Sequence, residues 1–284
     1  MYVCHMQASP LLRYATLDNG LRIAYVDVGP REGPCILFLH GLANYLWVWK
    51  WIMAPLQAHT RCIAIDLPGN GLSSRGPYAY GMDFFSDTIE KVVQHFALND
   101  LILAGHSMGG QIALHLALRR MPGLQKLLLF APAGLEYYSP HEAHLFQTAI
   151  QLGNFLSLDE VHISQSIRAS FFKQNKITEQ IITDLNELIR HHDRRQYRRM
   201  LEACIDSMLK QQIFPSLNKI HYPTLILFGD KDQLIPNRYL HPVSTAEIAR
   251  RGTAEMQQAR AVVFPDCGHF VQIEAAADCH TEIM

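Results

Sequence analysis

The sequence predicts an α/β fold in which helices flank a mostly parallel β-sheet of eight strands. Three observations predict this fold. Short apolar runs alternate with longer stretches of helical periodicity along most of the 284 residues. Between about residues 135 and 217 the alternation stops, and only helical patterns occur. A glycine-flanked serine also follows one of the central apolar runs. Together these features indicate crossover helices around a parallel sheet, with an all-helical insertion.

The first two predicted strands form a hairpin. Arg13–Asp18 and Leu21–Val28 are joined at Asp18-Asn19-Gly20, a sequence typical of tight turns between antiparallel strands. The later strands are more continuously apolar, as expected for strands that are buried on both faces. They are predicted at Cys35–Leu39, Arg61–Asp66, Leu101–Ala104, Lys126–Ala131, Thr224–Phe228 and Ala261–Phe264.

Helical patterns occupy most of the gaps between these strands. The predicted helices are Trp47–Gln57, Phe84–Phe96, Met108–Arg119 and Asn237–Arg250. Within the insertion, helices are predicted at Glu142–Leu152, from the N-cap Thr178 to about Ile189, and at Arg194–Leu209.

Two domains follow from this pattern. Residues 1–134 and 218–284 are predicted to form the core, and residues 135–217 a helical cap or lid. An insertion at this point would lie over the carboxyl ends of the strands, where open α/β sheets bind ligands. The alternative is a helical layer packed on the flank of the sheet.

The composition favours a compact globular protein and excludes several partners. Hydrophobic residues make up 49% of the chain and the formal net charge is −1, which gives no reason to expect nucleic acid or anionic lipid as a partner. No apolar stretch approaches the ~18 residues needed to span a bilayer, and the segment Met1–Met6 lacks the features of a signal peptide. A cytoplasmic protein is therefore expected. The sequence does not determine its oligomeric state.

Cysteine and histidine patterns predict neither a disulfide framework nor a metal site. The six cysteines form no CxxC pair and are interpreted as small buried side chains in a reducing compartment. The fifteen histidines include no HExxH. His191 and His192 are adjacent, so on a helix they would point ~100° apart rather than converge on one ion.

The segment Gly105–Gly109 carries the strongest chemical signal. It is a G-x-S-x-G that follows a buried-strand pattern and precedes a helix, the context that a nucleophile elbow requires. Ser107 would occupy a sharp, strained turn, and the two glycines would avoid clashes there. The Met108 amide would lie at the helix N-terminus, free to donate to a developing oxyanion. The competing interpretation is a glycine-rich turn with an incidental serine.

A serine nucleophile needs a positioned base, and the base needs an orienting acid. His269 lies in the loop after the last predicted strand, where Gly268 permits a tight turn. The preceding strand is followed by two carboxylates, Asp230 and Asp232, either of which could accept the imidazole N–H. Spacing alone does not separate these two aspartates.

At this point the chain resembles the α/β-hydrolase superfamily, in the group of capped serine hydrolases. Four motifs in order carry the resemblance, and they span almost the whole chain. They are His40-Gly41-Leu42-Ala43-Asn44, Asp66–Ser73, Gly105–Gly110, and the pair formed by Gly229–Pro236 and Gly268-His269.

The resemblance implies an α/β-hydrolase fold with a Ser-His-Asp triad. The family's G-x-x-D acid motif matches Gly229 to Asp232 and so selects Asp232 over Asp230. The amide of Leu42 corresponds to the family's second oxyanion donor, beside that of Met108. The implied activity is hydrolysis of a small or medium apolar carboxylic ester through an acyl-enzyme, with no metal or organic cofactor. Substrate contacts are predicted at Asn44, Leu234, Ile235, Phe270 and Val271.

Two other functions compete with ester hydrolysis. The first is carbon–carbon bond cleavage in a dienoate ring-fission product, because residues 170–179 are similar to the cap of that branch. That branch binds the substrate carboxylate with an arginine, where this chain has Thr183 or Asp184, so that Arg168 would have to serve instead. The second is a non-catalytic ligand-binding or interaction protein on the same fold. Such proteins usually lack a member of the triad, whereas all three residues are present here.

Overall fold

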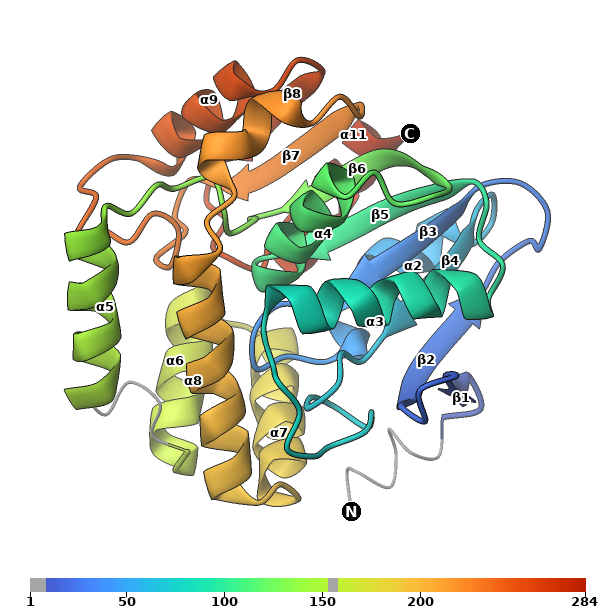
Figure 1. Ribbon diagram of the computed structural model, residues 1–284, viewed down its shortest axis with the longest axis horizontal. Helices are drawn as coiled ribbons and strands as arrows, with labels where there is room; N and C mark the ends of the chain where they lie inside the picture. Colours follow the sequence, from blue (N-terminus) through green and yellow to red (C-terminus); the bar gives the residue numbers. More distant parts are fainter. Residues whose placement is uncertain (1–8, 153–157) are drawn as a thin grey trace.

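The computed structural model describes residues 9–152 and 158–284. Eight strands form one sheet in the order β1-β2-β4-β3-β5-β6-β7-β8 (Figure 1). β2 runs antiparallel to both β1 and β4, and all other neighbours are parallel, so the predicted fold class is confirmed. The strands are β1 Leu12–Thr16, β2 Arg22–Val28, β3 Cys35–Leu39, β4 Arg61–Ile65, β5 Leu101–His106, β6 Leu124–Phe130, β7 Thr224–Gly229 and β8 Ala259–Phe264.

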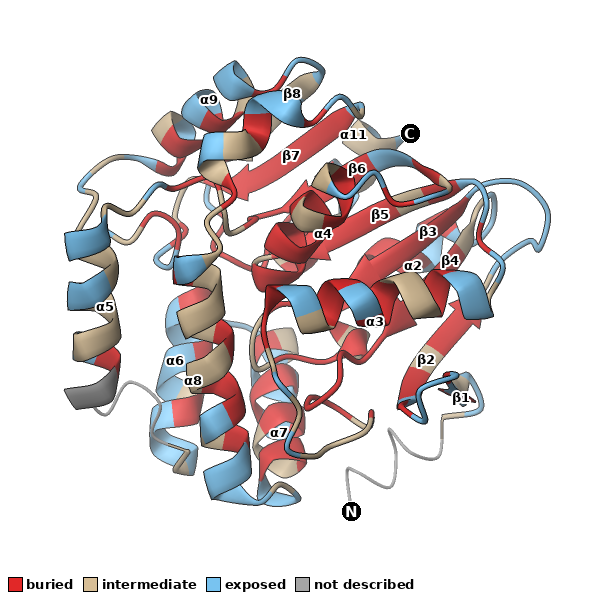
Figure 2. Ribbon diagram, in the orientation of Figure 1, coloured by how far each residue is buried: buried red, intermediate tan, exposed pale blue. Residues whose placement is uncertain are grey.

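Helices cover both faces of this sheet. Figure 1 shows α3, α4 and α9 in front of it and α2 and α11 behind it. Every residue of β3 and β7 is buried, as two covered faces require (Figure 2). The helical elements outside the segment between β6 and β7 are η1 Leu46–Trp49, α2 Lys50–Leu56, α3 Met82–His95, α4 Met108–Leu118, α9 Thr245–Glu255, α10 Val271–Glu274 and α11 Ala276–Ile283.

Among its described residues, the segment between β6 and β7 contains helices and their connecting turns but no strand. Its elements are α5 Pro140–Leu152, α6 Glu160–Ser170, α7 Lys176–Arg190, α8 Arg194–Lys210 and the short 3₁₀ helix η3 Phe214–Lys219. Figure 1 shows α5 to α8 grouped beyond the arrowheads of the parallel strands, at their carboxyl ends. We call α5 to α8 and their connections the helical insertion.

The turn between β1 and β2 has the predicted hairpin geometry. The Gly20 amide donates to the Leu17 carbonyl at 2.9 Å, and the Leu17 amide donates to the Leu21 carbonyl at 2.8 Å. Gly20 has a φ of 82°, a conformation that a glycine adopts without strain.

One predicted helix begins later than expected. The pattern Asn237–Arg250 places its start at Asn237, but α9 begins at Thr245 with Ser244 as its N-cap. The side chain of Asn237 accepts the Tyr239 amide at 3.2 Å and so forms a local turn instead. Pro242 then lacks the amide that a helix at this position would use.

In the helical insertion one predicted helix start is wrong and one helix was not predicted. Thr178 is not the N-cap of α7. Asn175 caps it, and its side chain accepts the amides of Ile177 and Thr178 at 2.8 and 3.2 Å. No helix was predicted over α6, whose N-cap Asp159 accepts the Val161 amide at 3.1 Å. The Asp-Glu pair at its start was the signal available for that helix.

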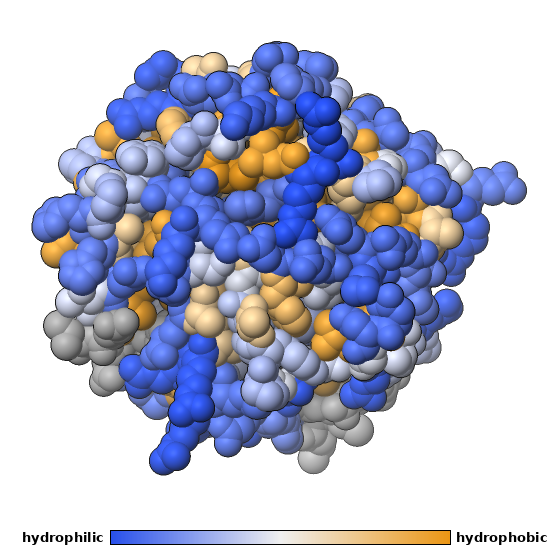
Figure 3. Space-filling model, viewed as in Figure 1, coloured by the Kyte–Doolittle hydropathy of each residue, from blue (hydrophilic) through white to orange (hydrophobic). Residues whose placement is uncertain are grey.

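The described cysteines Cys35, Cys62, Cys204, Cys267 and Cys279 are buried free thiols, whereas Cys4 and the segment Met1–Met6 lie outside the described residues. Among the described residues no helix has the length and apolarity of a membrane span, and no group of three His, Cys, Asp or Glu side chains converges for a metal. On the face drawn in Figure 3, hydrophobic residues appear as separate patches in a mostly hydrophilic surface.

The strand order locates the natural ligand crevice. The chain passes from β3 to β4 on one side and returns to β5 on the other side of β3. Such a reversal separates the loops that follow two adjacent parallel strands and leaves a crevice at their carboxyl ends. Here β3 pairs with β5 in the register Leu39 to Gly105, so the turns carrying Leu42 and Ser107 begin side by side.

Candidate active site

Ser107 occupies a strained turn between β5 and α4. Its φ is 53° and its ψ is −118°, in a region that residues with side chains rarely adopt. Its amide donates to the Phe130 carbonyl at 3.0 Å, and its carbonyl accepts the amides of Gly110 and Ala133 at 2.9 and 3.0 Å. These bonds hold the strained backbone in place, and Ser107 lines a cavity at this turn.

The flanking glycines are required for contacts that the sequence does not reveal. A Cβ on Gly105 would lie 2.3 Å from the Gly109 carbonyl oxygen, within the turn itself. A Cβ on Gly109 would lie 2.3 Å from the Leu39 carbonyl oxygen, at the end of β3. The second glycine is therefore required by the end of the neighbouring strand β3.

His269 and Asp232 are brought together from two adjacent strand ends. Asp232 follows β7 and His269 follows β8, and a 2.8 Å hydrogen bond joins His269 Nδ1 to Asp232 Oδ2. Both side chains are almost completely removed from solvent. The other oxygen of Asp232 accepts the amides of Leu234 and Ile235 at 2.8 and 3.0 Å. These two amides fix the orientation of the carboxylate.

Asp230 lies elsewhere. Its carboxylate pairs with Lys231 Nζ at 2.6 Å, and both side chains are partly exposed. The loop containing His269 passes over the end of β7, where a Cβ on Gly229 would lie 2.2 Å from the Cys267 carbonyl oxygen. The structure therefore brings Asp232, and not Asp230, to His269.

Two neutral histidines organise the backbone around Ser107. His40 bonds with the Gly41 carbonyl at 2.7 Å and accepts the Leu67 amide at 3.0 Å. Burial lowers the pKa of His40 to about 4. Burial also lowers the pKa of His106 well below its usual range, and its Nε2 donates to the His269 carbonyl at 3.0 Å. Both therefore stay uncharged near neutral pH.

A cavity of about 220 Å³ opens beside Ser107. Leu42, Leu234 and Ile235, which were predicted around the site, line it together with Ser107. Asn44, Phe270 and Val271 are buried and do not belong to its lining. Sequence reasoning missed its other lining residues, which come mainly from α4, the segment after β6 and α8. They are Gln111, Ala133, Gly134, Glu136, Tyr138, Phe146, Ile205, Met208, Leu209 and Gln212.

Glu136 is the charged group in this lining. Its Oε1 accepts the Asn237 amide at 2.9 Å and His241 Nδ1 at 2.8 Å. Burial raises the pKa of the Glu136 carboxyl despite these donors. The one signal available in the sequence was its place just after a strand end, where functional side chains of parallel sheets gather.

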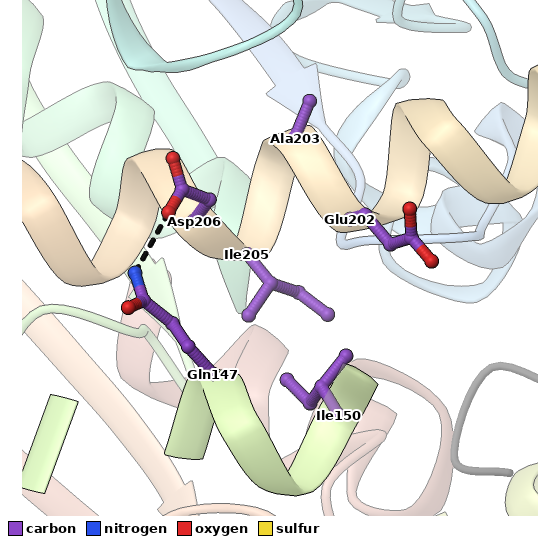
Figure 4. A pocket seen from close by; sticks show the side chains of 6 residues that line it. All are labelled: Gln147, Ile150, Glu202, Ala203, Ile205 and Asp206. Carbon is purple, nitrogen blue, oxygen red and sulfur yellow. Dashed lines mark hydrogen bonds between the residues drawn. The ribbon is translucent and has the colours of Figure 1, made fainter. Parts of the chain in front are cut away.

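A second cavity of about 250 Å³ lies between α5 and α8. Figure 4 shows its wall, with Gln147 Nε2 bonded to Asp206 Oδ1 across the two helices at 2.7 Å. Ile205 lines both this cavity and the one beside Ser107. The two cavities therefore share Ile205 as a lining residue.

Arg168, and the two residues that stand where the carbon–carbon hydrolases have their arginine, are all engaged in other contacts. Arg168 forms a two-pronged ion pair with Glu179, in which Nη2 lies 2.7 Å from Oε2, and both side chains are about half exposed. Asp184 is buried and accepts hydrogen bonds from Tyr45 Oη and Gln180 Nε2, both at 2.7 Å. Thr183 is exposed and bonds to the Glu179 carbonyl.

The fold and this arrangement define an α/β hydrolase, and the comparison with known families agrees. The family described as "alpha/beta hydrolase fold" matches residues 34–276, so the chain belongs to that family. The chain is 27% identical over 268 residues to the dihydrolipoyllysine-residue acetyltransferase component of the acetoin cleaving system of Pseudomonas putida. This alignment covers 94% of this chain and 66% of that protein.

Other relatives cover the chain to a similar extent. It is 26% identical over 280 residues to the monoacylglycerol lipase abhd6-B of Xenopus laevis, across 93% of this chain and 78% of that protein. A solved esterase from Exiguobacterium antarcticum superposes with a TM-score of 0.76 at 21% identity, covering 95% of this chain and 97% of the esterase. At 21% identity, this likeness shows a shared fold and nothing about the activity.

Proposed function

We propose that this protein is a serine hydrolase that cleaves a carboxylic ester of a small or medium apolar substrate. Ser107 is the nucleophile, His269 the general base and Asp232 the acid that orients it. The observation that carries the proposal is the buried 2.8 Å bond between His269 Nδ1 and Asp232 Oδ2 in the fold where Ser107 occupies the elbow. A buried acid that accepts the Nδ1 proton in a hydrogen bond fixes the tautomer that leaves Nε2 free to accept a proton.

The proposed reaction has two steps. His269 Nε2 takes the Ser107 hydroxyl proton while Oγ bonds to the ester carbonyl carbon, and the amides of Leu42 and Met108 stabilise the oxyanion. The carbon–oxygen bond then breaks, and the alcohol leaves with the proton held by His269. Water attacks the acyl-enzyme in the same way and releases the acid. The reaction requires no metal or organic cofactor.

No hydrogen bond joins the Ser107 hydroxyl to His269 within the described part of the chain. Bonds between a nucleophile and its base often form only in the complex with substrate. We therefore expect the bond to close when an ester occupies the cavity.

The cavity supports a small substrate. Its volume of about 220 Å³ is below the ~300–1,000 Å³ typical of sites for drug-sized ligands. Aliphatic side chains from three segments, among them Leu42, Met208 and Ile235, suit an apolar acyl or alkyl group. The similarity to a monoacylglycerol lipase also favours ester chemistry.

The cap assignment and the cellular location are part of the same proposal. We assign residues 135–217 as a cap because α8 contributes Ile205, Met208 and Leu209 to the cavity wall. The proposed boundary at residue 217 falls inside η3. The buried free thiols suit a reducing compartment, and we propose the cytoplasm.

Ester hydrolysis should exceed carbon–carbon cleavage in this protein. A dienoate substrate carries a carboxylate, whereas the described cavity lining offers the Glu136 carboxyl and no Lys, Arg or His side chain to pair with it. In steady-state assays, p-nitrophenyl butyrate should have a kcat/KM at least ~10-fold above that of a dienoate ring-fission product, which corresponds to about 1.4 kcal/mol. Arg168→Ala should leave both values unchanged. Efficient dienoate turnover that Arg168→Ala abolishes would instead establish the carbon–carbon hydrolase.

Ile205 should set the longest chain that the enzyme accepts. Ile205→Ala would connect the two cavities and allow longer acyl chains to extend between α5 and α8. Each methylene newly buried contributes about 0.8 kcal/mol, roughly fourfold in kcat/KM. Across a p-nitrophenyl ester series, the preferred chain should therefore lengthen, whereas Ile205→Trp should shorten it.

The matched control for this series is Val161→Ala, which truncates an exposed branched residue on α6. It should leave the chain-length profile unchanged. If Ile205→Ala and Ile205→Trp had the same chain-length profile as Val161→Ala and wild type, acyl chains would not approach Ile205.

A further inference from the structure

Three backbone amides converge on the carboxylate of Glu274, at the end of α10. Oε1 accepts the amides of Phe172 and Lys173 at 3.0 and 2.7 Å, and Oε2 accepts the amide of Gly268 at 2.8 Å. Phe172 and Lys173 belong to the loop between α6 and α7, whereas Gly268 directly precedes His269. One carboxylate therefore binds the helical insertion and the loop of the proposed base at the same time.

Two more contacts join the same segments. The His269 amide donates to the Ser170 carbonyl at 2.8 Å. The rings of Phe171 and Phe270 stack with centroids 4.5 Å apart and planes 9° apart, and both rings are buried. We call residues 170–173 together with 268–274 the insertion–base junction.

The junction is packed closely around Gly268. A Cβ there would lie 2.7 Å from Glu274 Oε2, from the Phe172 amide nitrogen and from the Ser170 carbonyl oxygen. Contacts this short leave no room for a side chain, so a displacement of the insertion loop would be transmitted to Gly268 and to its neighbour His269.

The three amides that Glu274 binds offset part of the cost of burying its carboxyl group. Burial raises the pKa of this half-buried carboxyl, and the three amide hydrogen bonds oppose that effect. Hydrogen bonds to an ionised acceptor are roughly twice as strong as those between neutral groups. Removing the charge should therefore loosen all three amides.

The backbone of His269 is held from the opposite side as well. His106, the residue before Ser107, donates from Nε2 to the His269 carbonyl at 3.0 Å. The carbonyl of His269 is thus attached to the nucleophile elbow through His106. The amide of His269 and the preceding residue, Gly268, are held by the insertion–base junction. The imidazole position relative to Ser107 depends on both attachments.

We infer that Glu274 is a positioning residue that makes the placement of His269 depend on the seating of the helical insertion. This inference rests on the proposed function, because it assigns His269 the role of base. Glu274 does not touch the reacting atoms. It acts through Gly268, so the seating of the insertion loop and the placement of the base depend on each other.

The test is Glu274→Gln. The amide oxygen of glutamine can still accept Phe172 and Lys173, but its NH₂ group then faces the Gly268 amide, donor against donor. A misplacement of about 1 Å can cost ~100-fold in rate. We expect kcat for p-nitrophenyl butyrate to fall about 10- to 100-fold with KM little changed. The rate of Ser107 labelling by a fluorophosphonate should fall in parallel, and the downfield NMR signal of the His269 Nδ1 proton should broaden.

Phe171→Leu is the second variant, because it weakens the junction from the insertion side and leaves α10 intact. It should also lower kcat at similar KM, and the double variant should lose less than the product of the two single losses. Glu282→Gln is the matched control. It removes another carboxylate of the C-terminal segment, which pairs with Arg260 at the surface, and should leave kcat unchanged.

The outcomes separate this inference from the proposed function. If Glu274→Gln and Phe171→Leu lower only the melting temperature, with kcat and labelling rate at wild-type values, Glu274 is a structural brace and the inference is overturned. If Glu274→Gln does not fold, Phe171→Leu alone decides by the same criterion. A wild-type protein that neither hydrolyses esters nor labels at Ser107 would contradict the proposed function itself.

Discussion

Replacing Ser107 by alanine should abolish ester hydrolysis without affecting the fold. Loss of a serine nucleophile costs about 10⁶-fold in kcat in a serine protease, because neither the base nor the oxyanion donors can replace the missing attack. Stability should be preserved, since only a hydroxyl is removed and the backbone bonds of the elbow remain. The measurement combines steady-state kinetics with a thermal unfolding curve.

Covalent labelling provides an independent test of the same residue. Ser107 Oγ should displace fluoride from the phosphorus of a fluorophosphonate, with its proton passing to His269. The phosphonyl group should then add its mass to the peptide that contains Ser107 in wild type only. Ser166→Ala, which removes an exposed hydroxyl from α6, is the control and should both label and turn over normally. Substantial residual kcat in Ser107→Ala, together with unlabelled wild type, would eliminate Ser107 as the nucleophile.

The two aspartates should differ by orders of magnitude. In Asp232→Asn, the amide oxygen can still accept Leu234 and Ile235, which turns the NH₂ group toward His269 Nδ1. Nδ1 must then be the acceptor and Nε2 carries the proton, so the imidazole cannot deprotonate Ser107. We expect kcat to fall by up to ~10⁴-fold.

Asp230→Asn is the matched comparison, two positions away on the same loop. Its carboxylate pairs with Lys231 in partly exposed surroundings, and such pairs contribute roughly 0–1 kcal/mol to stability. We expect nearly wild-type kcat. If Asp230→Asn had the larger loss, the assignment of the acid would be wrong even though the fold would stand.

The sequence by itself determined the sheet and the elbow, because both depend on local chemistry. Buried strands such as β3 need continuous apolar runs, and the turn at Ser107 needs glycine on either side. The apolar runs and the need for Gly105 act over a few residues and are therefore visible in the sequence, whereas Gly109 is required by its close approach to β3. Helix starts are equally local but less predictable, since Asn175 and Thr178 are both good caps and only one of them can start α7.

Only the tertiary structure decided which groups meet. Spacing left Asp230 and Asp232 equivalent, and the hydrogen bond to His269 distinguishes them because the β8 loop crosses the end of β7 at Gly229. Likewise, Ile205 reaches the cavity beside Ser107 only through the packing of α8. Glu274 binds a loop about a hundred residues away. Contacts between distant segments leave no periodicity in the sequence, because they depend on how whole elements pack.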